Sequence, residues 1–175
     1  MGITDLTSMG QPQWDVKRDI STRLHTLIET IPDYCFHCAK CTSGCEAHKL
    51  LELEPHKVIA LIKRGLIDEL VNSDIIWTCV TCLKCRERCP QKVSPVDALF
   101  ALKNMAVAQG NQIPGKYTGM LQSILSTGLI QSTQKIPAKD GHTKGREDLE
   151  LPPLSPPEHM EQFMGILTKI ATQKI

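Results

Sequence analysis

The sequence predicts an all-α protein of 175 residues. Apolar residues recur at three- and four-residue steps over several segments, which is the period of an amphipathic helix. No segment shows the sustained alternation of apolar and polar residues that is typical of strands. Proline and glycine residues lie where the helical pattern stops, as they commonly do at helix ends. We therefore expect short helices joined by loops.

The first expected helix stops at Pro32, because proline cannot continue a helix. Its apolar face comprises Val16, Ile20, Leu24, Leu27, Ile28 and Ile31. A second helix is expected from Pro55, since proline suits the first helical position. Its apolar face comprises Val58, Ile59, Ile62 and Leu66. Gly65 predicts a break in this stretch, followed by a short helix over 67–71.

The segment from Ser94 to Asp97 predicts the start of another helix. Ser94 is expected to cap it, Pro95 to occupy its first turn, and Asp97 to complete a capping box. This helix is expected to run to about Gln109, with Gly110 as its stop.

The rest of the chain is expected to form one more helix over 116–127 and then an extended, proline-rich arm from about residue 131. Five of the eleven prolines lie in this arm, at Pro137, Pro152, Pro153, Pro156 and Pro157. A terminal amphipathic helix is expected after it, with an apolar face of Met160, Phe163, Met164, Leu167 and Ile170. That face either docks on a partner subunit, which is the expectation, or folds back on its own domain. The expected organisation is a tail over 1–14, a helical domain over 15–130, and the arm with its helix over 131–175.

The composition excludes several classes of function. Twenty Lys and Arg against nineteen Asp and Glu give a net charge of +1, which lacks the basic excess of a dedicated nucleic-acid binder. No apolar run reaches the roughly 18 residues that a membrane span requires. Residues 1–13 have neither a basic start nor an apolar stretch, so no secretory signal is expected. We expect a cytoplasmic protein with reduced thiols.

All eight cysteines lie in two runs that share the spacing C-x2-C-x2-C-x3-C. The first run contains Cys35, Cys38, Cys41 and Cys45. The second run contains Cys79, Cys82, Cys85 and Cys89. Thiolates are soft ligands that select iron–sulfur clusters, zinc or cuprous copper, and a reducing compartment favours metal binding over disulfides.

The spacing favours two [4Fe–4S] clusters. Three cysteines at three-residue steps can wrap one loop around three corners of a cube, and the fourth ligand must then come from elsewhere. In two-cluster ferredoxins with this run, the fourth cysteine of each run binds the other cluster. Applied here, the first cluster takes Cys35, Cys38, Cys41 and Cys89. The second cluster takes Cys79, Cys82, Cys85 and Cys45.

Other chemistries fit the sequence less well. Zinc sites usually join two C-x2-C knuckles across a longer loop, which these runs do not resemble. His37 and His48 lie near the first run, but the thiolates complete the ligand count, so both are expected beside the site or in solvent. The chain has no G-x-G-x-x-G loop, no Ser-His-Asp arrangement and no spare cysteine. We therefore expect no catalytic residue and a role in electron transfer.

The two cysteine runs, and especially the second run with its surroundings, resemble the C subunit of heterodisulfide reductase, a helical ferredoxin-like family. The resemblance is carried by Ile76-Trp77-Thr78-Cys79-Val80-Thr81-Cys82-Leu83-Lys84-Cys85, by Cys89-Pro90 and by Ser94-Pro95. It covers about residues 15–130. Related modules occur in succinate dehydrogenase, glycolate oxidase and anaerobic glycerol-3-phosphate dehydrogenase. One departure is that Glu46 stands after Cys45 where Pro90 follows Cys89.

The resemblance implies a non-catalytic, electron-transfer subunit of an oxidoreductase complex in methanogenesis. Electrons would pass from a flavin- and iron–sulfur-bearing A subunit through the two clusters to a cysteine-rich catalytic B subunit. That B subunit would reduce the mixed disulfide of coenzyme M and coenzyme B. This chain lacks the adjacent cysteine pair expected of the B subunit, which fits a relay. A related complex in sulfur oxidation, another dehydrogenase and a free-standing ferredoxin are the open alternatives.

Overall fold

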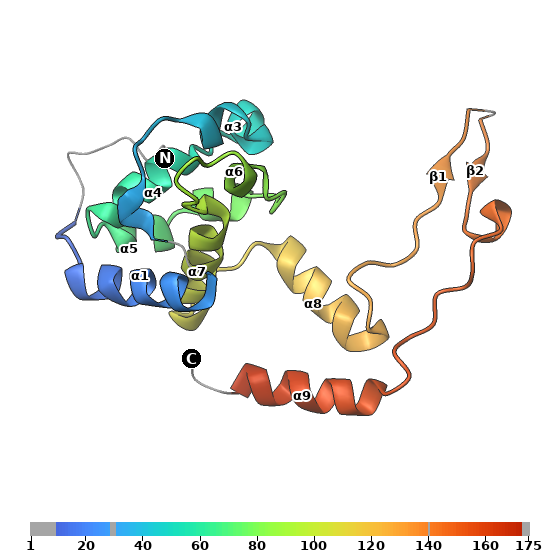
Figure 1. Ribbon diagram of the computed structural model, residues 1–175. Coiled ribbons are helices and arrows are strands. Elements are labelled where there is room, and N and C mark those ends of the chain that lie inside the picture. The colour runs from blue at the N-terminus through green and yellow to red at the C-terminus, as the bar shows by residue number, and fades with distance from the viewer. Residues whose placement is uncertain (1–9, 29–30, 140, 173–175) are drawn as a thin grey trace. The chain divides into compact units, whose positions relative to one another are not determined.

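The computed structural model describes residues 10–28, 31–139 and 141–172 (Figure 1). The chain forms two compact units, Met1–Gln112 and Ile113–Ile175, and each is described by itself. Most regular structure in the described ranges is helical, with two strands of two residues each. The all-α prediction is confirmed. No described helix is both long and apolar enough to span a membrane.

The first unit consists of two longer helices, α1 (Trp14–Ile28) and α7 (Pro95–Ala108), and several short helices and turns (Figure 1). In chain order they are α1 (Trp14–Ile28), η2 (Pro32–Tyr34), α2 (Lys40–Ser43), α3 (Glu46–Leu51), α4 (Pro55–Lys63), α5 (Ile67–Val71), η3 (Asp74–Thr78), α6 (Lys84–Glu87) and α7 (Pro95–Ala108).

Helix α7 is the centre of the first unit, where it contacts α1, α4, α5, α6 and η3. The core is apolar and belongs mainly to these helices. Its largest fully buried side chains include Ile20, Ile59, Ile62, Ile67, Leu70, Leu99 and Leu102. Burial of each such side chain contributes about 1.5–3 kcal/mol. The cysteine-bearing segments α2 and α6 contact each other and rest on α4 and α7, respectively.

The predicted helix boundaries around Gly65 and Gly110 are confirmed. Helix α4 begins at Pro55 and ends at Lys63, and Gly65 has a φ of +74°. Gly110, with a φ of +76°, follows the end of α7. A positive φ is accessible to glycine without a Cβ clash, so both residues stop the helix in a conformation that other residues rarely adopt.

The predicted capping box at Ser94 is wrong. Ser94 is the N-cap residue of α7, but its side chain makes no capping hydrogen bond. The Asp97 carboxylate instead lies 3.6 Å from the Arg86 guanidinium, in an ion pair that joins α7 to α6. A contact between two elements therefore replaces the local one.

The second unit contains two helices and a small hairpin. Its elements are α8 (Gly115–Thr127), β1 (Ile136–Pro137), β2 (Thr143–Lys144), η4 (Glu147–Leu149) and α9 (Met160–Thr172). The strands pair antiparallel, with Ile136 opposite Lys144 and Pro137 opposite Thr143. A plain extended arm from residue 131 is thus not confirmed. Two-residue strands with little burial leave no alternating pattern that a sequence could reveal.

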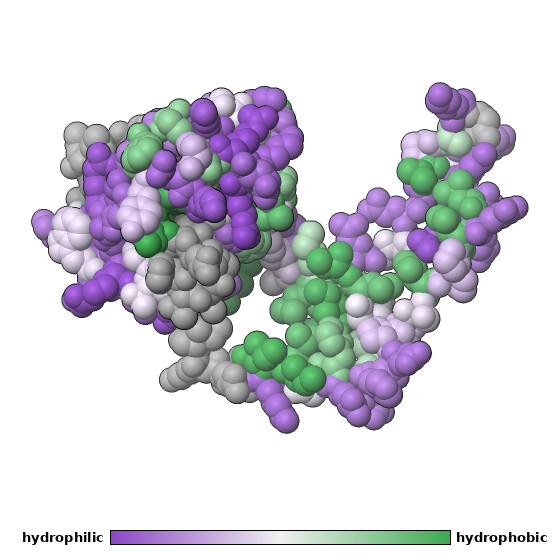
Figure 2. Space-filling view, viewed as in Figure 1, coloured by the Kyte–Doolittle hydropathy of each residue, from purple (hydrophilic) through white to green (hydrophobic). Residues whose placement is uncertain are grey.

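The apolar side chains of the second unit are largely unburied. Helix α8 has no buried residue. On α9, Met160, Phe163, Met164 and Leu167 are half-buried and Ile170 is exposed. Figure 2 shows the apolar surface that gathers over these two helices. This unit therefore presents apolar area that its own residues cover only in part.

Candidate metal centre

The two cysteine runs follow the same backbone path. A 3-10 turn, η2 or η3, ends directly before the first cysteine of each run. The second and fourth residues after that cysteine have left-handed φ values: His37 and Ala39 at 55° and 57°, Thr81 and Leu83 at 54° and 61°. A single helical turn, α2 or α6, then carries the third cysteine of the run.

This shared path is strained. A left-handed φ is uncommon for residues other than glycine, and it is an outlier for a β-branched residue such as Thr81. Each such residue costs on the order of 1–3 kcal/mol, and strain of this kind collects where a site constrains the backbone. Its recurrence at equivalent positions indicates that both loops are shaped for the same kind of ligand.

Each of two cavities is lined by cysteines from both runs. The first cavity is lined by Cys35, Cys38, Cys41 and Cys89. The second is lined by Cys45, Cys79, Cys82 and Cys85. Their empty volumes are about 360 and 350 Å³, so the two are nearly equal in size. In both cavities the fold brings three cysteines of one run together with the last cysteine of the other.

The N-terminal residues of α4 and α7 also line the cavities. His56 and Pro95 line the first cavity, and Pro55 and Val96 line the second. These helices belong to the apolar core, so the cavities are built directly on it. On the side of each cavity that faces this core, charges on bound groups interact more strongly with nearby charges than they would in water.

Burial controls the acidity of three of the thiols. Burial raises the pKa of Cys85 to about 12, although the Val96 backbone N–H acts in the opposite direction. Burial also raises the pKa of Cys79, opposed by the Thr81 backbone and by the charge of Lys103. Burial likewise raises the pKa of Cys41. Metal binding at these positions must displace protons, since only thiolates act as ligands.

Three functional candidates near the cavities were missed by the sequence analysis. His56 lies 2.7 Å from the Thr42 hydroxyl through Nδ1. The ammonium groups of Lys63 and Lys103 donate hydrogen bonds to the carbonyl oxygens of Cys35 and Cys79, at 3.1 and 3.3 Å. A usable signal existed for the lysines, because Lys63 and Lys103 each lie eight residues after a helix-starting proline.

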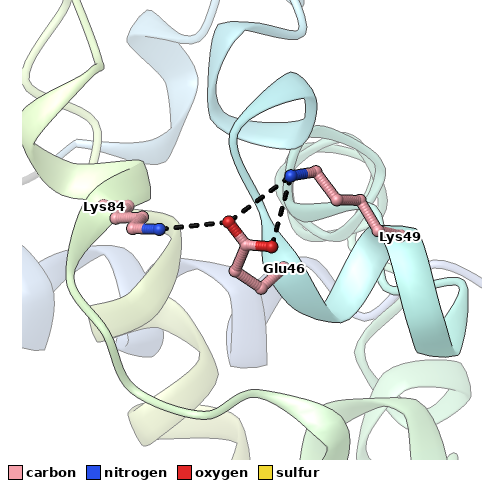
Figure 3. A network of polar contacts seen from close by, with 3 residues as sticks. All are labelled: Glu46, Lys49 and Lys84. Carbon is pink, nitrogen blue, oxygen red and sulfur yellow. Dashed lines mark hydrogen bonds and ion pairs between the residues drawn. The ribbon is translucent and has the colours of Figure 1, made fainter.

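The two runs are also joined by an ion-pair network (Figure 3). Glu46, directly after Cys45, accepts a hydrogen bond of 3.1 Å from Lys84 of α6. Lys49 contacts the other carboxylate oxygen at 3.2 Å. The hydrogen bonds from Lys84 and Lys49 lower the pKa of the Glu46 carboxyl. The residue that departs from the proline pattern thus connects the first run to the second.

The two histidines considered from the sequence line neither cavity. The His37 side chain is mostly exposed. Its pKa is lowered first by the partial loss of water around the ring and then by the positive charges of Lys63 and Arg64. His48 is half-buried. All eight cysteines are free thiols. Among the described residues, no three His, Cys, Asp or Glu side chains converge closely enough to hold a single metal ion.

Comparisons with known proteins agree with this donor set. Residues 31–93 match the 4Fe–4S dicluster domain. Two relatives are the iron–sulfur C subunit of the CoB–CoM heterodisulfide reductase of Methanopyrus kandleri and the C subunit of the H2:CoB–CoM heterodisulfide,ferredoxin reductase of Methanothermobacter thermautotrophicus. The first is 27% identical, covering 83% of this chain and 77% of the relative. The second is 30% identical, covering 82% and 72%. A protein of Archaeoglobus profundus that is named as similar to the heterodisulfide reductase C subunit is 37% identical, covering 59% and 58%.

The residues present fit two [4Fe–4S] clusters. The donor set is eight free thiols over residues 35–89, inside the matched dicluster domain. Four thiols line each cavity, which is the number that one such cluster takes.

Proposed function

Because this chain belongs to the family of the heterodisulfide reductase C subunit, we propose that it relays electrons between two other subunits of such a complex. Electrons enter from a flavin-bearing A subunit and leave to a catalytic B subunit, which reduces the mixed disulfide of coenzyme M and coenzyme B. The observation that carries this proposal is the pair of neighbouring four-cysteine cavities. The names of the relatives, which are heterodisulfide reductases, supply the substrate.

We propose a crossed set of ligands for the two clusters. Cluster 1 takes Cys35, Cys38, Cys41 and Cys89. Cluster 2 takes Cys79, Cys82, Cys85 and Cys45. The lining of the two cavities supports this assignment, because each cavity contains the last cysteine of the other run. Each run then contributes to both clusters, which keeps the clusters adjacent.

The bound clusters supply one-electron redox chemistry. The protein contributes thiolate ligands, apolar walls from α4 and α7, and lysines near the ligand backbone. We assign no substrate chemistry to this chain, because the eight cysteines are all used as ligands. We propose a cytoplasmic location, because this role needs reduced thiols.

We further propose that residues 131–175 dock on a partner subunit. The apolar face of α9, which is only partly covered, supports this role. Deletion of 131–175 should weaken co-purification with partner subunits while leaving about eight iron atoms per chain. Loss of the clusters in this variant would instead show that the segment supports the cluster domain. A full-length chain that never co-purifies with another subunit would favour a free-standing ferredoxin.

The crossed assignment is tested with single serine variants of the anaerobically purified chain. Cys89→Ser is compared with Cys38→Ser and Cys82→Ser by iron content and by electron paramagnetic resonance of the reduced protein. The expected result is that Cys89→Ser perturbs the same signal as Cys38→Ser. If Cys89→Ser perturbs the signal that Cys82→Ser perturbs, each run binds its own cluster and the crossed assignment is wrong. Wild-type protein without iron would overturn the electron-transfer function itself.

A further inference from the structure

The two cavities are related by more than their cysteines, because an equivalent lysine serves each of them. Lys63 lies eight residues after Pro55, and Lys103 lies eight residues after Pro95. Pro55 begins α4, which follows the first run and the short helix α3, and Pro95 begins α7, which is the next helix after the second run. The two lysines therefore share a position on their helices, counted from the starting proline, although Lys63 lies 28 residues after Cys35 and Lys103 lies 24 residues after Cys79.

Both lysines make the same contact. The Lys63 ammonium donates a hydrogen bond of 3.1 Å to the carbonyl oxygen of Cys35. The Lys103 ammonium donates one of 3.3 Å to the carbonyl oxygen of Cys79. Cys35 and Cys79 are the first cysteines of their runs, and each lines a different cavity. Each cavity thus has one ammonium group held at the backbone of one of its cysteines.

The two lysines differ in burial. Lys103 is only 6% exposed, and its ammonium lies 5.9 Å from the ring centres of both Trp77 and Phe100. Lys63 is half-buried. A cation interacts more strongly with a neighbouring charge where water is excluded. Lys103 should therefore act more strongly on its cavity than Lys63 does on the other.

The chemistry of the bound group gives the direction of this effect. A cluster with four thiolate ligands is anionic, and reduction adds one more negative charge. A nearby cation stabilises the reduced form more than the oxidised form and so raises the reduction potential. A hydrogen bond that only fixed the loop would lack this directional electrostatic effect.

We propose that Lys63 and Lys103 are positioning residues that hold the first ligand cysteine of each run and raise the reduction potential of the adjacent cluster, Lys103 more than Lys63. Lys63 acts on cluster 1 and Lys103 on cluster 2. This inference rests on the proposed ligand assignment.

The test is a redox titration of the full chain, followed by electron paramagnetic resonance, for Lys103→Met, Lys103→Arg and Lys63→Met. Methionine removes the charge at similar length, and arginine keeps it. Lys57→Met is the matched control, because Lys57 is also on α4 but pairs with the Glu54 carboxylate, whereas Lys63 donates to the Cys35 carbonyl. Cluster 2 is identified as the signal lost in Cys82→Ser.

Lys103→Met should lower the equilibrium constant for reducing cluster 2 about tenfold, which is 59 mV for one electron, and leave cluster 1 unchanged. Lys103→Arg should stay close to wild type. Lys63→Met should lower the potential of cluster 1 by a smaller amount, and Lys57→Met should move neither.

Unchanged potentials in both methionine variants, with both clusters intact, would overturn the inference and leave the electron-transfer function standing. An equal shift in Lys103→Arg and Lys103→Met would also overturn it, because charge would then not be the cause. If Lys103→Met loses cluster 2, the test rests on Lys63→Met instead. An unchanged reduction potential of cluster 1 in Lys63→Met then overturns the proposal. Absence of iron from the wild-type chain is a different outcome, and it removes the proposed function.

Discussion

The Lys84 ammonium donates a hydrogen bond of 3.1 Å to the Glu46 carboxylate, which lies 38 positions earlier in the chain. Glu46 follows the last cysteine of the first run, and Lys84 begins the helical turn that carries the third cysteine of the second run. The contact therefore ties together two loops that each contribute to both cavities. Both side chains are about half exposed, so the ion pair is screened by water and salt.

Glu46→Pro should retain both clusters and a melting temperature close to that of the wild type. Cys45 has φ −86° and ψ 118°, a conformation that a residue before proline adopts readily. Position 46 is the first residue of α3, where proline is well tolerated, and the lost ion pair is an exposed one. Thermal unfolding monitored by circular dichroism, together with iron analysis, measures the result.

Lys49→Pro is the matched control for this substitution. The Lys49 backbone N–H donates to the carbonyl of Cys45 at 3.4 Å, and proline would remove this donor inside the helix. A loss of about 3 kcal/mol is expected for proline in a helix interior. Equal destabilisation by Glu46→Pro would contradict the expectation that proline is tolerated at position 46, the first residue of α3.

Leu102→Ala should lower the free energy of unfolding by about 2–5 kcal/mol, the range for truncating a fully buried leucine. Leu102 is 0% exposed on the central helix α7. Val107→Ala, on the same helix at 49% exposure, should change it by no more than about 0.5 kcal/mol. Denaturant unfolding under anaerobic conditions measures both. Similar losses for the two variants would mean that α7 does not bury Leu102 in the core while leaving Val107 exposed.

Gly65→Ala should destabilise the first unit by roughly 1–3 kcal/mol, because alanine at a φ of +74° is strained. An added Cβ would also lie 3.1 Å from the backbone nitrogen of Gln13, which cannot move freely. Gly115→Ala, at the first position of α8 with no atom within 4 Å of the added Cβ, is the control. It should be neutral or slightly stabilising, since alanine favours a helix. Denaturant unfolding of each variant distinguishes the two results.

The stability of the protein should fall as the pH drops below about 6.5, and His56→Gln should make this dependence shallower. Burial lowers the pKa of His56 from its ordinary value of 6.5; the charges of Lys57 and His48 act in the same direction and that of Glu54 opposes them. The unfolded imidazole therefore binds a proton at a higher pH than the folded one does. Stability is therefore lost as the pH falls from the pKa of His56 in the unfolded chain to its lower pKa in the folded protein.

Melting temperatures at about pH 7.5 and about pH 5.5, with iron content checked at each, measure the effect of His56. The pKa of His37 is also lowered, mainly by burial, so His56→Gln should reduce the slope without removing it. A variant with the same pH dependence as the wild type would show that His56 does not contribute.

Removal of iron by a chelator should open the two cysteine runs more than the core. Few side chains of α2 and α6 are buried, whereas α4 and α7 bury most of their apolar residues. Amide hydrogen exchange should therefore rise most over 35–45 and 79–89. A uniform rise that includes α4 and α7 would show that the clusters also maintain the helical core.

Much of the local structure follows from the sequence because it depends on neighbouring residues. Pro55, Gly65 and Gly110 mark helix ends through their own φ preferences, so these boundaries could be read directly. The cysteine spacing likewise predicted the number and kind of clusters, since three of the four ligands of each cluster are expected from one short loop. The family, too, was recognisable from the second run and its flanking residues.

Only the tertiary structure decided which distant residues meet. Asp97 pairs with Arg86 instead of capping its own helix, and Lys103 reaches the carbonyl of Cys79 across 24 positions. Burial, which raises the pKa of Cys85, also depends on packing and not on the neighbours of that residue in the chain. Such contacts form when helices pack through their apolar faces. The apolar periodicity of a sequence indicates which face of a helix is buried, but it does not indicate which distant groups its polar side chains will contact.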